Sequence, residues 1–226
     1  MLIHIREVLT PDVVKDILNQ LGQSSWGDGR ETAGYLSSRV KDNAQLLETS
    51  PLARKLGNII LDALDRNQQF ISAALPLKVV PPLFNRYTGG QAYGGHIDGA
   101  VRPVAGTPLR VRTDLSATLF LSAPESYDGG ELIIEDDFGE RRVKLPSGDM
   151  VLYPGTSIHR VAPVTRGTRF ASFFWVQSMV REDARRSLLY ELDGVVQTLG
   201  GTESPHKEVV RLAGIYHNLL RFWADS

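Results

Sequence analysis

Cysteine is absent from this chain of 226 residues. Its absence excludes disulfides, thiolate metal sites, iron–sulfur clusters and cysteine nucleophiles, so a metal site would need His, Asp and Glu ligands. Neither sign of charge is in excess, because 25 Lys and Arg stand against 26 Asp and Glu. A general electrostatic attraction to nucleic acid or to a membrane is therefore not expected, and an anionic partner would have to be bound locally.

Long apolar runs are also missing. The N-terminal stretch from Met1 to Glu7 already contains charged residues and lacks the apolar core of a signal peptide. No later stretch approaches the roughly 18 apolar residues of a membrane span. We therefore expect a soluble, cytoplasmic protein. Its length is enough for one sizeable domain that buries about 70 to 75% of its unfolded surface.

Two helices are predicted in the N-terminal part, residues 1–78. Thr10-Pro11-Asp12 supplies a cap, a first-turn proline and a first-turn acid before an apolar stripe at helical spacing that stops at Gly22. Ser50-Pro51 repeats this start signal before a second stripe that runs on to about Leu75. The pattern indicates a short helix followed by a longer one.

Residues 177–226 also have a helical pattern. One apolar stripe stops at Gly200-Gly201, and another begins at Val209. We interpret this part as a helical extension that either covers the core or forms a dimer interface, and we expect a homodimer.

The central residues 79–176 contain short runs of β-branched and aromatic residues, separated by turn signals such as Asp128-Gly129-Gly130. Eight such runs without crossover helices predict a two-sheet jelly roll or barrel, mainly β with flanking helices, and argue against a parallel α/β sheet. Residues 1–176 would form one domain, and the aromatic residues near its end would fill the core. The predicted strands are 79–87, 92–97, 115–121, 131–135, 141–145, 149–153, 158–164 and 168–176, and the aromatic residues are Phe170, Phe173, Phe174 and Trp175.

Three residues of the β region have the chemistry of metal ligands. His96 lies near the end of the predicted strand 92–97, and Asp98 follows two positions later, so extended backbone places both on one face. His159 follows 61 residues after Asp98. Two imidazoles and one carboxylate on one side of a metal leave the other side open, as non-haem Fe(II) requires. The same ligands suit Zn²⁺ with an activated water, so a zinc-dependent hydrolase is the alternative. The remaining histidines, His4, His206 and His217, are predicted to be surface or helix-packing residues.

Arg169 lies ten positions beyond His159. If Thr165-Arg166-Gly167 is a three-residue hairpin loop with Gly167 in the left-handed conformation, Arg169 pairs with Pro163 and shares a face with His159. The gap of about 13 Å between His159 and Pro163 along a strand can be filled by a five-carbon dicarboxylate and an Arg side chain. Because the guanidinium binds a carboxylate through two charge-assisted hydrogen bonds, we predict a carboxylate site beside the metal.

The surrounding motifs resemble a known family. The run from Phe84 to Asp98, the segment from Asp114 to Leu121 and the turn from Tyr127 to Leu132 resemble the Fe(II)/2-oxoglutarate dioxygenases. More closely, they resemble the bacterial PKHD-type hydroxylases, which are relatives of the prolyl and lysyl hydroxylases. The resemblance covers nearly the whole chain, including the C-terminal helical extension, and the spacing of His159 and Arg169 belongs to it.

This resemblance implies a double-stranded β-helix core with His96, Asp98 and His159 as iron ligands. It implies that Arg169 holds the distal carboxylate of 2-oxoglutarate. Tyr87 resembles a tyrosine that reaches this cosubstrate in prolyl hydroxylases, but it could equally be a core aromatic residue. The implied reaction uses O2 and 2-oxoglutarate to hydroxylate a substrate, releases succinate and CO2, and depends on L-ascorbate (vitamin C) to keep the iron ferrous.

The substrate stays open at this point. The family name points to peptidyl proline or lysine, whereas some bacterial relatives are linked to iron uptake, which favours a siderophore-like small molecule. Arg102, Arg110 and Arg112 lie in a segment between two predicted strands, which is either a binding loop for an acidic substrate or an ordinary solvated loop. A non-catalytic jelly-roll module that senses iron or 2-oxoglutarate is a further alternative.

Overall fold

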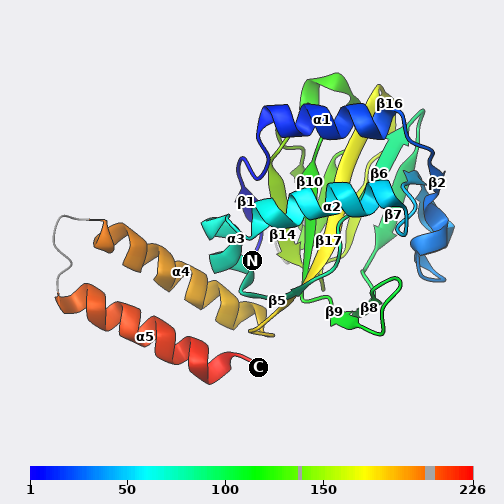
Figure 1. The fold of residues 1–226 in the computed structure, drawn as a ribbon. Coiled ribbons are helices and arrows are strands. Elements are labelled where there is room, and N and C mark those ends of the chain that lie inside the picture. Colours follow the sequence, from blue (N-terminus) through cyan, green and yellow to red (C-terminus); the bar gives the residue numbers. More distant parts are fainter. Residues whose placement is uncertain (137–138, 202–206, 226) are drawn as a thin grey trace.

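Antiparallel sheets form the core of the computed structural model, which describes residues 1–136, 139–201 and 207–225 (Figure 1). The larger sheet has eight strands in the order β1-β14-β10-β17-β6-β4-β2, with β5 paired to β17, and the smaller has the order β13-β12-β15-β7-β3. The larger sheet comprises β1 (Ile3–Ile5), β2 (Gly27–Asp28), β4 (Ala44–Gln45), β5 (Pro76–Val79), β6 (Leu83–Thr88), β10 (Leu115–Phe120), β14 (Met150–Pro154) and β17 (Thr168–Ser178). The smaller comprises β3 (Lys41–Asp42), β7 (Ala92–His96), β12 (Leu132–Asp136), β13 (Gly139–Val143) and β15 (His159–Val161).

Two short hairpin-like pairs complete the β structure. The pair β8 (Val101–Pro103) and β9 (Arg110–Arg112) projects from one end of the core, and β11 (Asp128–Gly129) pairs with β16 (Val164–Arg166) (Figure 1). These strands confirm the predicted jelly-roll architecture. Two predicted strands are each divided in the structure: residues 79–87 into β5 and β6, and residues 158–164 into β15 and β16.

Helices cover the outer face of the larger sheet. α1 (Pro11–Gly22) and α2 (Pro51–Leu64) lie across this face in Figure 1, and their fully buried side chains Ile17 and Leu56 join one core with Phe174 of the sheet. Burying these side chains stabilises the layer, at about 1.5–3 kcal/mol for each large apolar residue. The helices leave the other face of the sheet free to form a cavity.

The helix predicted to run to about Leu75 is interrupted. α2 ends at Leu64, and a separate helix, α3 (Gln68–Ala74), begins after Asn67, whose side chain accepts a hydrogen bond from the Phe70 amide at 2.8 Å. The prediction of one continuous helix is therefore wrong. The apolar stripe did not show the break because both helices bury residues in the same core.

The predicted hairpin before Arg169 is only half right. Gly167 has the expected left-handed φ of 72°, but β17 pairs with β6, so Arg169 lies opposite Tyr87 and not Pro163. The carbonyl oxygen of Pro163 already accepts from the Gly130 amide at 3.3 Å, and that of Val164 accepts from Gly90 at 2.7 Å. The chain thus leaves the β11–β16 pair at Gly167 and enters the larger sheet as β17.

The N-terminal part contributes strands that were not predicted. β1 pairs with β14, β3 with β7, and β4 with β6. Each has only two or three residues, which is too short for a recognisable alternation of apolar and polar side chains. They attach the segment before α2 to both sheets, next to the cavity.

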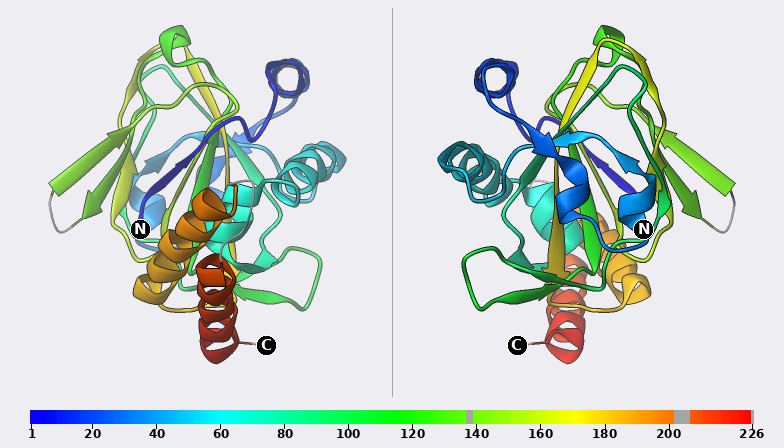
Figure 2. Two further views of the ribbon diagram at one scale, coloured as in Figure 1. Left: turned by 90° about the vertical axis from the view of Figure 1, so that its left-hand side faces the viewer. Right: turned by 90° about the vertical axis from the view of Figure 1, so that its right-hand side faces the viewer.

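The predicted C-terminal helices are confirmed as α4 (Asp183–Gly200) and α5 (Lys207–Trp223), which pack side by side beyond α3 (Figures 1 and 2). Leu189 of α4 is fully buried against Leu75 and Val180. Within the described residues, no helix has the length and apolar character needed to cross a membrane.

Candidate metal centre

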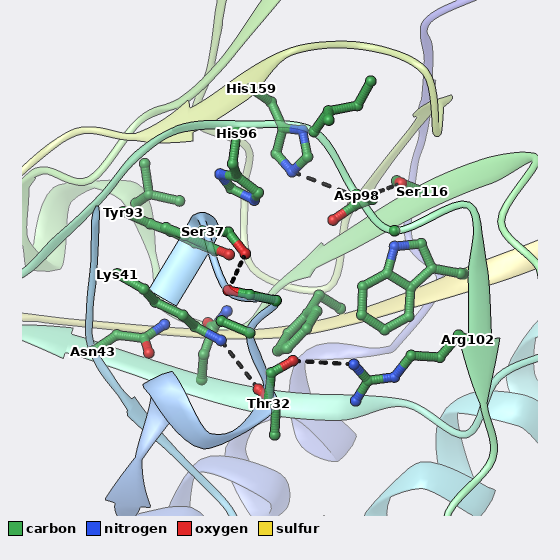
Figure 3. A pocket seen from close by; sticks show the side chains of 18 of the residues that line it. Thr32, Ser37, Lys41, Asn43, Tyr93, His96, Asp98, Arg102, Ser116 and His159 are labelled. Atoms are coloured by element: carbon green, nitrogen blue, oxygen red, sulfur yellow. Dashed lines mark hydrogen bonds and ion pairs between the residues drawn. The ribbon is translucent and has the colours of Figure 1, made fainter. Parts of the chain in front are cut away.

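His96, Asp98 and His159 converge on one point of a cavity between the sheets (Figure 3). His96 ends β7 and lies opposite His159, which begins β15, so the antiparallel pairing brings their rings to 4.2 Å between centroids. One ligand atom of each of the three residues lies within 4.8 Å of the others. The three side chains could therefore hold one metal ion.

Asp98 reaches this point by a route that differs from the prediction. β7 ends at His96, so Asp98 lies in the following loop and not on the same strand face. Its Oδ2 accepts a hydrogen bond from the Ser116 hydroxyl at 2.7 Å and lies 3.8 Å from His159 Nε2. Ser116 of β10 thus orients the carboxylate from the facing sheet.

Hydrogen bonds also orient both imidazoles. Nδ1 of His96 lies 2.9 Å from the Gly94 carbonyl oxygen, and Nδ1 of His159 lies 3.1 Å from that of Ser157. A carbonyl accepts a hydrogen bond only from a protonated nitrogen, so Nδ1 is the donor and the Nε2 lone pair is left for a metal. Contacts of this kind fix the tautomer of a ligating histidine.

The ring of His96 is held in the neutral state that a metal requires. Burial, together with the neighbouring His159, lowers the pKa of His96 to about 4. Tyr93 stacks on His96 with ring centroids 3.6 Å apart, which shields one face of the imidazole from water. Gly94, between them, permits the close approach of Val40, because a Cβ at Gly94 would lie 2.8 Å from Val40 Cβ.

Arg169 is a buried cation on the wall of the same cavity, with 1% of its surface exposed. Its Nη1 is 3.5 Å from Asn85 Oδ1, while Nε and Nη2 make no hydrogen bond of good geometry to any described residue, although the Tyr127 hydroxyl is near. Unpaired buried donors are costly. A carboxylate bound in the cavity would satisfy them.

Tyr87 lies beside Arg169, since the two residues are paired in the register of β6 and β17. The guanidinium carbon lies 5.4 Å from the centre of the Tyr87 ring. Burial raises the pKa of Tyr87 to about 12, so the phenol is neutral and can donate a hydrogen bond. Both sequence-predicted cosubstrate residues therefore line one side of the cavity.

The cavity has a volume of about 1090 Å³ and is closed at its outer side by two segments. One contains the short 3₁₀ helices η1 (Gly29–Thr32) and η2 (Ser37–Val40), and the other is the β8–β9 hairpin. Of the three arginines predicted for a binding loop, only Arg102 lines the cavity. Arg112 instead pairs with Asp114 at 2.6 Å, and Arg110 is exposed.

The aromatic residues predicted for the core divide between two faces of β17. Phe174 is buried in the core beneath α1 and α2, and Phe170 packs against it. Trp175 is buried in a smaller cluster on the other face, where Phe173 packs against it, and both also border the cavity. A strand alternates its faces, so this division follows from the register. The prediction that these residues fill the core is confirmed, with the addition that Phe173 and Trp175 also line the cavity.

Three residues of the site were missed by sequence reasoning: Lys41, Tyr93 and Ser116. Tyr93 and Ser116 lie inside the motifs that carry the family resemblance, so a signal existed. Lys41 belongs to a two-residue strand without any periodic pattern. Outside the site, His4 pairs with Asp149 at 2.7 Å and His217 is exposed, while His206 lies outside the described residues.

Comparison with known protein families accounts for most of the chain. Residues 82–177 match the 2OG-Fe(II) oxygenase superfamily, and residues 183–225 match the PKHD-type hydroxylase C-terminal domain. A PKHD-type hydroxylase of Bordetella pertussis is 58% identical over 225 residues, which cover 100% of both chains. The two matched segments meet near the boundary between β17 and α4.

Solved structures share the fold at low sequence identity. A prolyl hydroxylase of Trichoplax adhaerens, in complex with a hypoxia inducible factor peptide fragment, is 14% identical with a TM-score of 0.55, covering 83% of this chain and 86% of that one. HygX of Streptomyces hygroscopicus, with nickel, 2-oxoglutarate and hygromycin B bound, is 15% identical with a TM-score of 0.52, covering 78% and 82%.

Proposed function

Because this chain belongs to the PKHD-type hydroxylases of the 2OG-Fe(II) oxygenase superfamily, we propose that His96, Asp98 and His159 hold Fe(II) and that Arg169 binds the distal carboxylate of 2-oxoglutarate. One observation carries this assignment. Two imidazoles and a carboxylate share their cavity with a buried arginine that has no carboxylate partner among the described residues. Tyr87 completes the cosubstrate side as a neutral hydrogen-bond donor.

The bound iron and 2-oxoglutarate would supply the oxidising chemistry that hydroxylates a substrate C–H bond with O2, releasing succinate and CO2. Residues of the chain orient the metal ligands and line the cavity. Ser116 fixes the orientation of Asp98, and the Nδ1 hydrogen bonds of both histidines leave their Nε2 lone pairs for the metal. The aromatic rings of Tyr93 and Trp175 exclude water from the cavity.

The substrate is either a peptidyl proline or lysine, or a siderophore-like small molecule. Solved relatives of the fold hold a peptide in one case and hygromycin B in another, and both kinds of molecule are compatible with the cavity size. A link to iron uptake, the use of ascorbate and a cytoplasmic location are carried over from the resemblance and from the sequence, and they stay predictions.

A homodimer is our further proposal. Apolar side chains of both C-terminal helices face outward, and a second copy would cover them. Val195→Asp places a charge among them, so we expect it to lower the molecular mass measured by light scattering from dimer to monomer, while Gln197→Asp on the same helix does not. A wild-type chain that is monomeric would contradict this proposal. The outward residues are Leu188, Val195, Leu199, Val210, Ile215 and Phe222.

The iron assignment is tested with His96→Ala, and with His217→Ala as the matched control on an exposed histidine. Without O2, wild-type protein with Fe(II) and 2-oxoglutarate should show a weak visible charge-transfer band, and with O2 it should release succinate. We expect His96→Ala to lose both signals and His217→Ala to keep both. A zinc hydrolase would give no charge-transfer band, and a non-catalytic sensor would release no succinate. Release of succinate by His96→Ala at the wild-type rate would contradict the iron assignment.

A further inference from the structure

Lys41 is a buried cation that the reaction proposed above does not use. It has 6% of its surface exposed, and its ammonium group donates to the Thr32 hydroxyl at 3.1 Å and to Gln45 Oε1 at 3.2 Å. Both acceptors are neutral, and Lys41 makes no ion pair within the residues that the structure describes. A buried ammonium group without a counterion is unfavourable unless a bound partner supplies one.

Arg102 of the β8–β9 hairpin approaches the same place from the other side. Its Nη1 donates to the Thr32 carbonyl oxygen at 3.1 Å, so two cations converge on one residue (Figure 3). Arg102 has a carboxylate partner, Glu48, at 3.3 Å, but its Nε has no hydrogen bond. The pair of cations therefore keeps one uncompensated positive charge.

The two cations repel each other, and this lowers the pKa of Lys41. Burial lowers the pKa of Lys41 to about 8, and the charge of Arg102 lowers it as well, while Asp98 and Asp28 act in the opposite direction. The ammonium group is still mostly protonated at neutral pH. An anion between the two cations would relieve the repulsion and replace the water that burial removed.

Lys41 and Arg102 lie on a different side of the cavity from Arg169. Arg169 lies over the rings of Tyr87 and Phe120, whereas Lys41 lies 5.2 Å from the centre of the Tyr93 ring and 5.9 Å from that of Phe173. In Figure 3 the metal ligands lie across the cavity from Lys41 and Arg102. The surface between the cations and the metal ligands is largely aromatic.

Building on the proposed function, we propose that Lys41 and Arg102 bind a carboxylate of the substrate that is hydroxylated. The aromatic walls, which include Tyr93, Phe173 and Trp175, then hold an apolar or aromatic body next to the metal ligands. The substrate is thus an acid whose carboxylate lies at the outer end of the cavity, while its reacting C–H group points to the metal. Lys41 and Arg102 are specificity-determining residues.

The test compares benzoate with benzamide, which have the same ring but different charge. Their affinities are measured by calorimetry on protein loaded with Mn(II) and 2-oxoglutarate, so that no turnover occurs. We expect wild-type protein to bind benzoate about tenfold or more tightly than benzamide, because one charge-assisted hydrogen bond contributes at least that factor. Lys41→Met should remove the preference, Lys41→Arg should retain it, and Lys15→Met on the exposed face of α1 should leave it unchanged.

A second pair of test compounds identifies the kind of substrate that supplies the carboxylate. N-acetylglutamate α-amide against N-acetylglutamine amide represents an acidic side chain of a peptide, whereas benzoate represents a free small acid. A preference in either pair that disappears in Lys41→Met supports the proposal. Absence of a preference in both pairs, or a preference that Lys41→Met keeps, overturns it.

Two controls separate this proposal from its premise. The affinity of Lys41→Met for 2-oxoglutarate should equal that of the wild type, and a matching loss would instead place Lys41 in the cosubstrate site. Arg102→Gln, a second variant that keeps a donor toward Thr32, should weaken the benzoate preference by a smaller factor, since Arg102 already has Glu48 as a partner. A failure of the iron assignment would appear in the turnover of His96→Ala, which these binding measurements do not use.

Discussion

The three candidate metal ligands are oriented by hydrogen bonds from groups that are not ligands themselves. Ser116 orients Asp98 from the facing sheet, and backbone carbonyls orient both histidines. Arg169 lies among aromatic rings with donors to spare, which is a costly arrangement for the folded chain alone. Costs of this kind are expected where function requires them, and here they support the proposed binding of a carboxylate.

Replacing Arg169 with Met keeps an unbranched side chain but removes the guanidinium. Two charge-assisted hydrogen bonds of about 1.5–3 kcal/mol each would be lost, so the Kd for 2-oxoglutarate should rise on the order of 100-fold or more. Anaerobic titration of the charge-transfer band measures this constant. Arg166→Met, which removes an exposed arginine from the neighbouring strand, should leave it unchanged. A wild-type Kd in Arg169→Met would show that the cosubstrate binds elsewhere.

The secondary-structure elements differ in how clearly the sequence predicts them. Long strands and helices with a start signal are recognisable because each contains several periods of its pattern, as α2 does after Ser50 and Pro51, where the Ser50 hydroxyl accepts from the Ala53 amide. Thr10 lies at the N-cap position of α1 but makes no side-chain cap hydrogen bond, so the predicted cap is only positional. The strands β2, β3 and β4 have two residues each, which is too short to show an alternation of apolar and polar side chains. Only their pairing with other strands defines them. The break between α2 and α3 depends on a single cap residue inside a continuous apolar stripe.

Asn67 is that cap residue, and its removal tests the break. Asn67→Ala loses the hydrogen bond to the Phe70 amide, so the free energy of unfolding should fall by about 0.5–2 kcal/mol. Urea denaturation followed by circular dichroism measures it. Asn67→Asp retains a side-chain acceptor and should remain close to the wild type. Equal stability of the Ala and Asp variants would mean that the cap contributes nothing here.

At the scale of the whole molecule, the helical extension is bound to the β core through α3. Leu189 of α4 is buried against Leu75, and Gln69 of α3 donates to the Tyr190 hydroxyl at 3.3 Å. The division into residues 1–176 and 177–226 stays a prediction of the sequence pattern. The buried contacts favour a single cooperative unit, in which loss of packing at α4 is transmitted to the cavity.

Leu189→Ala tests this coupling, with Glu191→Ala, at an exposed position of the same helix, as the control. The buried substitution should cost about 2–5 kcal/mol, and the exposed one less than about 0.5 kcal/mol. Thermal unfolding followed both by helical circular dichroism and by loss of 2-oxoglutarate binding should show one transition, lowered in Leu189→Ala. Two separate transitions, with only the helical one lowered, would establish an independent extension.

The sequence by itself determined the alternation that makes the longer strands, the starts of α1 and α2, and the residue types available as metal ligands. These are local properties, because caps, turn residues and strand periods act over a few neighbouring residues. The absence of cysteine limited the ligands to His, Asp and Glu from the outset.

Only the tertiary structure decided which of these residues meet. Asp98 lies beyond the end of its strand and reaches His159 because Ser116 of the other sheet holds it. Arg169 lies beside Tyr87 since strand pairing, not the turn at Gly167, sets its neighbour. Lys41 enters the cavity through a two-residue strand. Contacts between distant segments depend on the register of paired strands and on which backbone groups are already hydrogen-bonded, and neither is a property of the local sequence.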